Sequence, residues 1–309
     1  MSMTAPPAMA LTVDVEGEWY ELPGEQGFFD LNKVLVAVKS LEALLIRIES
    51  DTATRIPVTW FIRCDDSVAV TTGRAEGLLQ SLDTFVQRRL DLGDQFGLHP
   101  HLYRFNEGNW SSETTPEKQQ EQIHRAALAW ERHFGALPKL SRMGEAVMNN
   151  VIAATLDTLG IQMDSSALAG RSRFDNGFQF DWSTTPTQPY YPAVADYRRP
   201  ASMEEPAHRF IEAPFSMLPI IGPHDREPIK RYCNLAFKSS LVGSALRRID
   251  RPGHLIMVVH PHELLASKYS HPLISHDPAS LQENIHHLGQ VFGSLNFCLL
   301  SDCMKHGYQ

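Results

Sequence analysis

The chain has 309 residues, 43% of them hydrophobic and 21% charged, and its 28 basic and 36 acidic side chains give a formal net charge of -8. These values are ordinary for a globular protein, and they exclude a disordered chain and a basic nucleic-acid-binding protein. No apolar run approaches the roughly 20 residues that cross a bilayer, and the first ten residues lack the features of a secretion signal. We therefore expect a cytoplasmic protein without membrane contacts.

Short apolar runs alternate with amphipathic segments along the chain. Strands are expected at residues 10–15, 57–62, 95–101, 139–142, 161–164, 210–214, 255–259 and 297–300. Helices are expected at 31–48, behind Asp30 as N-cap, and at 78–90, 116–133, 146–159, 234–248 and 278–292. Residues 169–209 are rich in Pro, Tyr, Asp and Ser without long periodicity, which predicts an extended loop or lid insertion.

This alternation predicts a parallel α/β fold in a single domain of residues 1–309. At this length a barrel is favoured over a doubly wound sheet. A dinucleotide-binding sheet would need a glycine-rich turn after its first strand, where this chain has Asp14-Val15-Glu16. The four cysteines form no CxxC motif, which predicts free thiols rather than a disulfide framework or a zinc knuckle.

Polar residues follow the predicted strands at the edge where α/β barrels carry their active sites. They are Asp14, Glu16, His99, His101, Arg142, Asp164, His260 and His262. His260 ends an apolar run, and an imidazole there can serve as a general acid near neutral pH. The alternative is a structural histidine before a proline turn. His262 has the same spacing, and the sequence does not choose between the two.

Two pairs among these residues are spaced by two. Asp14 and Glu16 project from one face of a strand, and neighbouring carboxylates are costly unless a cation lies between them or one is protonated. This indicates a metal or acid–base role; the alternative is a solvated strand end. His99 and His101 follow Gly97 with the same spacing. Imidazole is a good ligand for zinc, nickel, cobalt or iron, and the alternative is a pair of structural histidines.

The motifs together resemble the polysaccharide deacetylases of carbohydrate esterase family four. They occur in that family's order: Thr12-Val13-Asp14-Val15-Glu16, Val58-Thr59-Trp60-Phe61-Ile62, Gly97-Leu98-His99, Arg142-Met143-Gly144, Leu159-Gly160-Ile161-Gln162-Met163-Asp164-Ser165-Ser166 and Val258-Val259-His260-Pro261. The match runs over residues 10–170 and 205–302. The resemblance implies a distorted barrel of the (β/α)7 type.

The resemblance also implies a site. It makes Asp14 the general base and Glu16 a metal ligand, with one residue between them as in a variant branch with an acid-x-acid motif. His99 takes the place of the first histidine ligand. The family's second histidine lies four residues further on, where this chain has Tyr103. His101 is expected to substitute for it, since strand alternation points it the same way; an altered or metal-free site is the alternative.

Further roles come from the same resemblance. Arg142 would orient Asp14 and keep it ionised, and Asp164 would tune His260, the acid for the leaving amine. The implied cofactor is a divalent metal ion, zinc first, with nickel, cobalt or iron as alternatives. The implied reaction is the removal of an acyl group, above all N-acetyl, from an amino sugar or a related amide.

The expected partner is a small-molecule or carbohydrate substrate, and a homo-oligomer is left open. Candidate sugar platforms are the aromatic residues Trp19, Tyr20, Tyr103, Trp110, Trp182, Tyr190 and Tyr191; for each the alternative is packing against loops. Two other functions stay open: hydrolysis of a different C–N bond, in a ureide or cyclic amide, and non-catalytic carbohydrate binding on the same fold.

Overall fold

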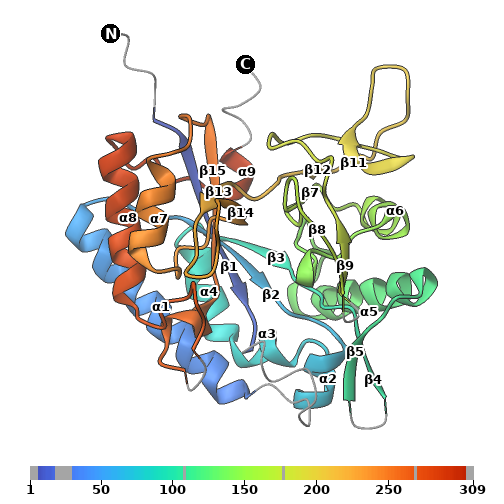
Figure 1. Ribbon diagram of the computed structural model, residues 1–309. Helices are drawn as coiled ribbons and strands as arrows, with labels where there is room; N and C mark the ends of the chain where they lie inside the picture. The colour runs from blue at the N-terminus through green and yellow to red at the C-terminus, as the bar shows by residue number, and fades with distance from the viewer. Residues whose placement is uncertain (1–5, 18–29, 107–108, 176–177, 268–269, 304–309) are drawn as a thin grey trace.

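The computed structural model describes residues 6–17, 30–106, 109–175, 178–267 and 270–303. At its centre lies a sheet of seven parallel strands in the order β12-β7-β6-β3-β2-β1-β15, curled into a half-barrel with helices around it (Figure 1). The strands are β1 (Ala8–Val15), β2 (Val58–Ile62), β3 (Gln95–Leu98), β6 (Leu140–Ser141), β7 (Met163–Asp164), β12 (Ile211–Glu212) and β15 (His254–Val259). The predicted barrel-type α/β fold is confirmed.

Helices pack around this sheet. They are α1 (Leu31–Thr52), α2 (Asp66–Thr72), α3 (Gly77–Ser81), α4 (Asp83–Asp91), α5 (Pro116–Phe134), α6 (Asn150–Thr158), α7 (Ser239–Leu246), α8 (Ala279–Phe292) and α9 (Leu300–Cys303), with short 3-10 turns η2 (Gly144–Ala146) and η3 (Pro261–Leu264). The predicted N-cap of α1 is confirmed, because the Asp30 carboxylate accepts a hydrogen bond from the Lys33 amide at 3.2 Å. Within the described residues, no helix combines the length and apolarity that a bilayer span requires.

Strand β1 has no exposed residue, and its two faces serve different purposes. The side chains of Met9, Leu11, Val13 and Val15 belong to the large core that also holds α1. Ala8 and Ala10 belong to a second apolar cluster on the other face. Because strand side chains alternate, Asp14 and Glu16 continue this second face. Burial of the odd-numbered side chains therefore fixes the direction of the two carboxylates.

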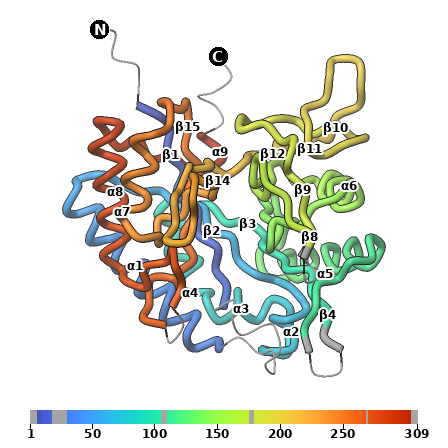
Figure 2. Tube along the Cα trace, viewed as in Figure 1, coloured from blue at the N-terminus to red at the C-terminus, as the bar shows by residue number. Residues whose placement is uncertain are grey.

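Among the described residues, four pairs of antiparallel strands lie outside the central sheet (Figure 2). They are β4 (Tyr103–Asn106) with β5 (Asn109–Ser112), β8 (Ser172–Asp175) with β9 (Phe178–Asp181), β10 (Pro192–Ala193) with β11 (Asp196–Pro200), and β13 (Met217–Ile220) with β14 (Ile229–Tyr232). Two of these pairs lie inside residues 169–209, so the expectation of an extended loop there is corrected. These strands have five residues or fewer, which is too short for a clear alternation in the sequence.

Two further expectations were wrong in detail. The helix expected at 78–90 is divided at Leu82 into α3 and α4. The strand expected at 297–300 is absent: Phe297 makes a single bridge to Met9, and the chain then turns into α9. Leu300 and Cys303 are both buried, and their spacing of three suits a helical turn rather than an alternating strand.

Candidate active site

The carboxyl ends of β1, β3 and β15 bring the two predicted pairs and His260 together. The Glu16 Oε2 atom lies 2.8 Å from His101 Nε2 and 3.5 Å from His99 Nε2. The two imidazole Nε2 atoms are 3.2 Å apart. His260 Nε2 lies 3.5 Å from Glu16 Oε1 and 3.7 Å from Asp14 Oδ2. Side chains that lie far apart in the sequence, from Asp14 to His260, therefore form one cluster.

Both histidines of the pair make hydrogen bonds to residues outside the cluster. The His99 ring contacts the Arg142 carbonyl through Nδ1 at 2.8 Å, which makes Nδ1 the donor and leaves the Nε2 lone pair directed at the cluster. The His101 backbone amide donates to Asp65 Oδ2 at 3.1 Å, and Arg63 donates to the same carboxylate at 2.7 Å. A ring contact like that of His99 fixes ring orientation and tautomer in metal sites, whereas the backbone bond of His101 positions only its main chain, and its Nδ1 has no hydrogen-bond partner among the described residues.

Glu16, His99 and His101 fit a divalent metal ion. Their ligand atoms all lie within 4.8 Å of one another, and all three residues are buried within the cluster. Four ligands at about 2.0–2.1 Å from a tetrahedral zinc ion stand roughly 3.3 Å apart, close to the three separations given above. A carboxylate and two imidazoles leave further coordination positions for water and substrate. The predicted Glu–His–His grouping is thus present, with His101 in place of the family's second histidine.

The electrostatics of these three groups favour an ionised glutamate beside the imidazoles. Burial opposes the charge of Glu16, but hydrogen bonds from His101 and then His99 hold its pKa well below the ordinary value. Burial also opposes a charge on His99, yet Asp14 and Glu16 raise its pKa. Burial, with the nearby charge of Arg63, lowers the pKa of His101. His101 is therefore the imidazole more readily kept neutral, the form that binds metal.

Arg142 contacts Asp14, the residue that the resemblance led us to expect it to orient. Its Nη1 donates to Asp14 Oδ1 at 2.6 Å and to Thr12 Oγ1 at 2.8 Å. The guanidinium carbon lies 4.3 Å from the centre of the Phe61 ring and 4.2 Å from that of the Phe215 ring. Arg142 is 1% exposed. Two more hydrogen bonds go to Ser165, from Nε to its carbonyl at 2.8 Å and from Nη2 to its Oγ at 3.0 Å. Two aromatic faces and four hydrogen bonds leave this side chain a single position.

His260 is held by Glu263, a residue that the sequence interpretation missed. The ring contacts Glu263 Oε2 through Nδ1 at 3.0 Å, and Asn234 Nδ2 donates to the same oxygen at 2.7 Å. Burial alone would lower the pKa of His260, but the charge of Glu263, then those of Glu16 and Asp14, raise it to about 10. The signal was present in the sequence, because Glu263 follows His260 by three residues in one turn of η3.

Asp164 is placed differently from its predicted role. It accepts hydrogen bonds from Ser141 Oγ at 2.6 Å and from the Ser166 amide at 3.1 Å, and it pairs in register with Glu212. The carboxylate that binds His260 is Glu263 instead, so the assignment of Asp164 to His260 is corrected. The reason is topological: β7, which carries Asp164, lies five places from β15 in the sheet.

Tyr103 stays outside the ligand group. Its hydroxyl donates to Glu145 Oε1 at 3.0 Å, and its ring centre lies 5.4 Å from that of His101. Glu145 has a left-handed backbone (φ 56°), unusual for a residue other than glycine. The preceding residue, Gly144, lies close to His101, since a Cβ on Gly144 would stand 2.3 Å from the His101 ring. This segment therefore packs directly against the candidate metal ligands.

The aromatic residues predicted as sugar platforms differ in how far they are buried. Trp182 and Tyr190 are 1% and 4% exposed, and their polar atoms bond to Ala146 O and Tyr197 O. Buried rings offer no open face to a sugar, so these two assignments are corrected to packing. Trp110 is buried too, whereas Tyr191 is 49% exposed. Trp19 and Tyr20 lie outside the described residues.

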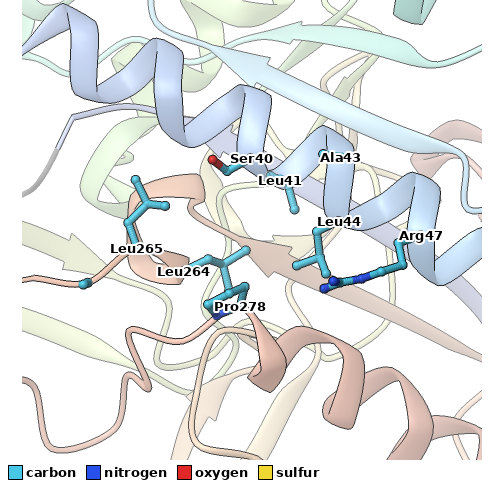
Figure 3. Close-up of a pocket in the computed structure, with 9 residues that line it drawn as sticks. Ser40, Leu41, Ala43, Leu44, Arg47, Leu264, Leu265 and Pro278 are labelled. Atoms are coloured by element: carbon cyan, nitrogen blue, oxygen red, sulfur yellow. The ribbon is translucent and has the colours of Figure 1, made fainter.

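A cavity of about 460 Å³ lies between α1 and the end of η3, and it does not include the site (Figure 3). Its walls come from α1, from the segment after η3 and from Pro278 at the start of α8. Apolar side chains such as Leu41, Leu44 and Leu264 dominate the lining. None of the clustered acids and histidines lines it, so it is not a candidate for the chemistry.

The fold and this cluster define an α/β half-barrel protein with a candidate metal centre at the carboxyl edge of its sheet. No protein-family model and no curated protein matches the sequence. Among solved structures, 94% of the chain is similar to 68% of a protein from Parabacteroides distasonis assigned as a glycoside hydrolase/deacetylase, with TM-score 0.58 and 11% identity. This likeness confirms that the chain has the deacetylase fold that the sequence resemblance implied.

Two other likenesses are weaker in shape. One covers 99% of this chain and 94% of a protein from Mycobacterium smegmatis assigned as a polysaccharide deacetylase, with TM-score 0.48 and 16% identity. The other covers 96% of this chain and 90% of a family 4 acetyl xylan esterase from Clostridium thermocellum, solved with a cobalt ion, with TM-score 0.44 and 11% identity.

Proposed function

We propose that the protein is a metal-dependent hydrolase that removes an acyl group, above all N-acetyl, from an amino sugar or a related amide. The observation that carries this proposal is the grouping of Glu16, His99 and His101 beside Asp14 and His260. The three ligand atoms fit a divalent ion, and zinc is the ion we propose. Such an ion, when bound, supplies Lewis-acid activation of water and of the substrate carbonyl.

The other residues divide the acid–base work. Arg142 donates to one oxygen of Asp14, so that the second oxygen of this carboxylate can take a proton from the attacking water. His260 is bound by Glu263 at Nδ1, and its Nε2 lies beside Asp14 and Glu16. It is placed to give a proton to the departing nitrogen. Loss of either group should lower the rate by about 10²–10⁴-fold.

Metal analysis tests the ligand assignment. Wild-type protein dialysed against zinc should retain about one ion per chain, and the double variant Glu16→Ala/His99→Ala should retain none. His286→Ala, which removes an exposed histidine of α8, is the matched control and should keep the ion. Full zinc occupancy in the double variant would overturn the assignment.

Activity on a substrate panel tests the reaction. N-acetylated amino sugars should release acetate with wild-type protein and not with Asp14→Asn. Turnover of ureides or cyclic amides alone would replace the proposal by hydrolysis of another C–N bond. Sugar binding without turnover of any compound would replace it by non-catalytic carbohydrate binding.

The state of the cysteines supports the proposed cytoplasmic location. Cys64, Cys233, Cys298 and Cys303 are all free thiols, and three of them are buried. Unpaired thiols are typical of proteins kept in a reducing compartment. Cell fractionation with an antibody to the chain should find the protein in the cytoplasmic fraction; recovery from the secreted fraction would contradict this.

A further inference from the structure

Two of the four thiols lie together on one face of β1. Phe297 bridges to Met9, and the Cys298 amide donates to the Met9 carbonyl at 2.9 Å. Because side chains alternate along an extended segment, Phe297 points into the large core with Met9, and Cys298 points to the opposite face. Cys303 reaches this second face from α9, where its sulfur lies 3.6 Å from the Ala8 carbonyl oxygen.

The two thiols are in hydrogen-bond contact with each other. The Cys303 thiol donates to the Cys298 sulfur, and this bond lowers the pKa of Cys298 although burial opposes the change. The same bond, together with burial, raises the pKa of Cys303, which keeps its proton. Cys298 is also the partly exposed member of the pair, whereas Cys303 is buried. The thiolate therefore forms on the sulfur atom that a reagent from solvent can reach.

The other two cysteines lack this arrangement. Cys64 and Cys233 are fully buried in the large apolar core. Burial raises the pKa of both thiols, to about 12 for Cys233. Buried thiols of this kind are chemically inert, so these two cysteines are internal references for the reactivity of the pair.

We propose that Cys298 and Cys303 form a reversible redox pair, in which a hydroperoxide oxidises Cys298 and Cys303 then closes an intramolecular disulfide. With hydrogen peroxide, the Cys298 thiolate attacks one oxygen and the O–O bond breaks. The sulfur becomes a sulfenic acid, and the released hydroxide takes up a proton to give water. The Cys303 sulfur next attacks the sulfenic sulfur, and its proton leaves with the hydroxyl group as a second water. Two thiols and one peroxide thus give one disulfide and two waters, and a small thiol reverses the change by exchange.

The pair lies far from the candidate active site. It contacts the amino end of β1, with α9 at the same end of the sheet (Figure 1), whereas Asp14 and Glu16 follow at the carboxyl end. At about 3.3 Å per residue, Ala8 and Asp14 are about 20 Å apart along the strand. The redox pair is therefore independent of the proposed hydrolytic function. Disulfides that form transiently in a reducing compartment are usually redox-sensing.

Mass spectrometry of the full chain tests the pair. Reduced wild-type protein is treated with hydrogen peroxide, alkylated with N-ethylmaleimide and digested. The peptide with both Cys298 and Cys303 should carry no label and be lighter than the dithiol peptide by two hydrogen atoms, and dithiothreitol should restore both thiols. Before oxidation, Cys298 should react with N-ethylmaleimide at least about tenfold faster than Cys64 or Cys233.

Three variants assign the roles within the pair. Cys303→Ser removes the thiol that closes the disulfide, so Cys298 should stop at the sulfenic acid, which dimedone labels. Cys298→Ser should leave Cys303 reduced. Cys64→Ala, which keeps both members of the pair, is the matched control and should form the disulfide as the wild type does.

Several results would overturn the redox pair. They are four labelled thiols in wild-type protein after peroxide treatment, a disulfide between two chains, and oxidation of Cys298 to a sulfinic acid. Reaction of Cys298 with N-ethylmaleimide no faster than that of Cys64 would do the same. Because the wild-type measurements need no substitution, a variant that fails to fold leaves the test intact. The hydrolase proposal stands or falls separately, on the release of acetate.

Discussion

Replacing Glu263 by Gln tests whether this residue, rather than Asp164, controls His260. In the wild-type protein the Glu263 carboxylate accepts from His260 Nδ1 at 3.0 Å, and both side chains are largely buried. Glutamine keeps the shape and an accepting oxygen but removes the negative charge. The charged form of the imidazole should therefore lose stabilisation, and the pKa of His260 should fall from about 10.

The size of the fall follows from the contact. A hydrogen bond between charged groups contributes roughly 1.5–3 kcal/mol, and each pH unit of pKa corresponds to about 1.4 kcal/mol. We expect the pKa of His260 to fall by about one to two pH units. Because the folded-state pKa is raised above the ordinary 6.5, the stabilisation from this pair is full below pH 6.5 and is lost as the pH rises through about 10. In the variant this loss moves to lower pH.

The assay is an NMR titration of histidine rings in the metal-free protein, with His260→Ala to assign the resonance. Urea unfolding at pH 6, 8 and 10 gives the matching free energies. Glu263→Asp keeps the charge and is the control. If His260 still titrates near pH 10 in the Gln variant, the reasoning from the Glu263 contact is refuted, and so it is if the Asp variant shows the same fall as Gln.

Three more outcomes are expected. Zinc at 100 times its dissociation constant should raise the melting temperature by about 4 °C, seen by calorimetry, and an equal rise in His99→Ala would contradict the ligand assignment. Gly144→Ala should weaken zinc binding and cost about 1–3 kcal/mol in unfolding free energy, since the new Cβ meets the His101 ring at 2.3 Å; unchanged zinc affinity would speak against this contact. Burial and the charge of Asp164 raise the pKa of Glu212, so the wild type loses stability as the pH rises from the ordinary carboxyl pKa through the raised one; Glu212→Gln should lose less, and parallel unfolding curves at pH 6 and 9 would disprove it.

Sequence reasoning reached the fold and the centre of the site because both follow from short-range patterns. The spacing of two in Asp14 and Glu16, and again in His99 and His101, directs each pair to one face, and parallel strands bring both to one edge. The alternation of apolar residues was sufficient to predict that strands end at these positions. The resemblance also led us to expect Arg142 beside Asp14, and a 2.6 Å hydrogen bond joins the two side chains.

What could not be predicted depends on the order of strands and on burial. Nothing local in the sequence shows that β7 lies far from β15. Asp164 was therefore predicted as the partner of His260, whereas the structure has Glu263 in that place. The burial of Trp182 likewise depends on how a distant segment folds over η2, where its indole donates to Ala146 O. A tryptophan in a proline-rich stretch has the same sequence signal whether it packs inward or faces a ligand.

The aromatic enclosure of Arg142 has a consequence for the energetics of turnover. When the chain folds, the rings of Phe61 and Phe215 exclude water from the guanidinium group of Arg142. The dipoles around Asp14 are therefore already aligned before a substrate arrives, and little solvent has to rearrange as charge moves during the reaction. In the proposed reaction, two phenylalanines without any reactive atom thus contribute to the preorganisation of Asp14 as the base, and their effect would be felt in the activation barrier rather than in substrate affinity.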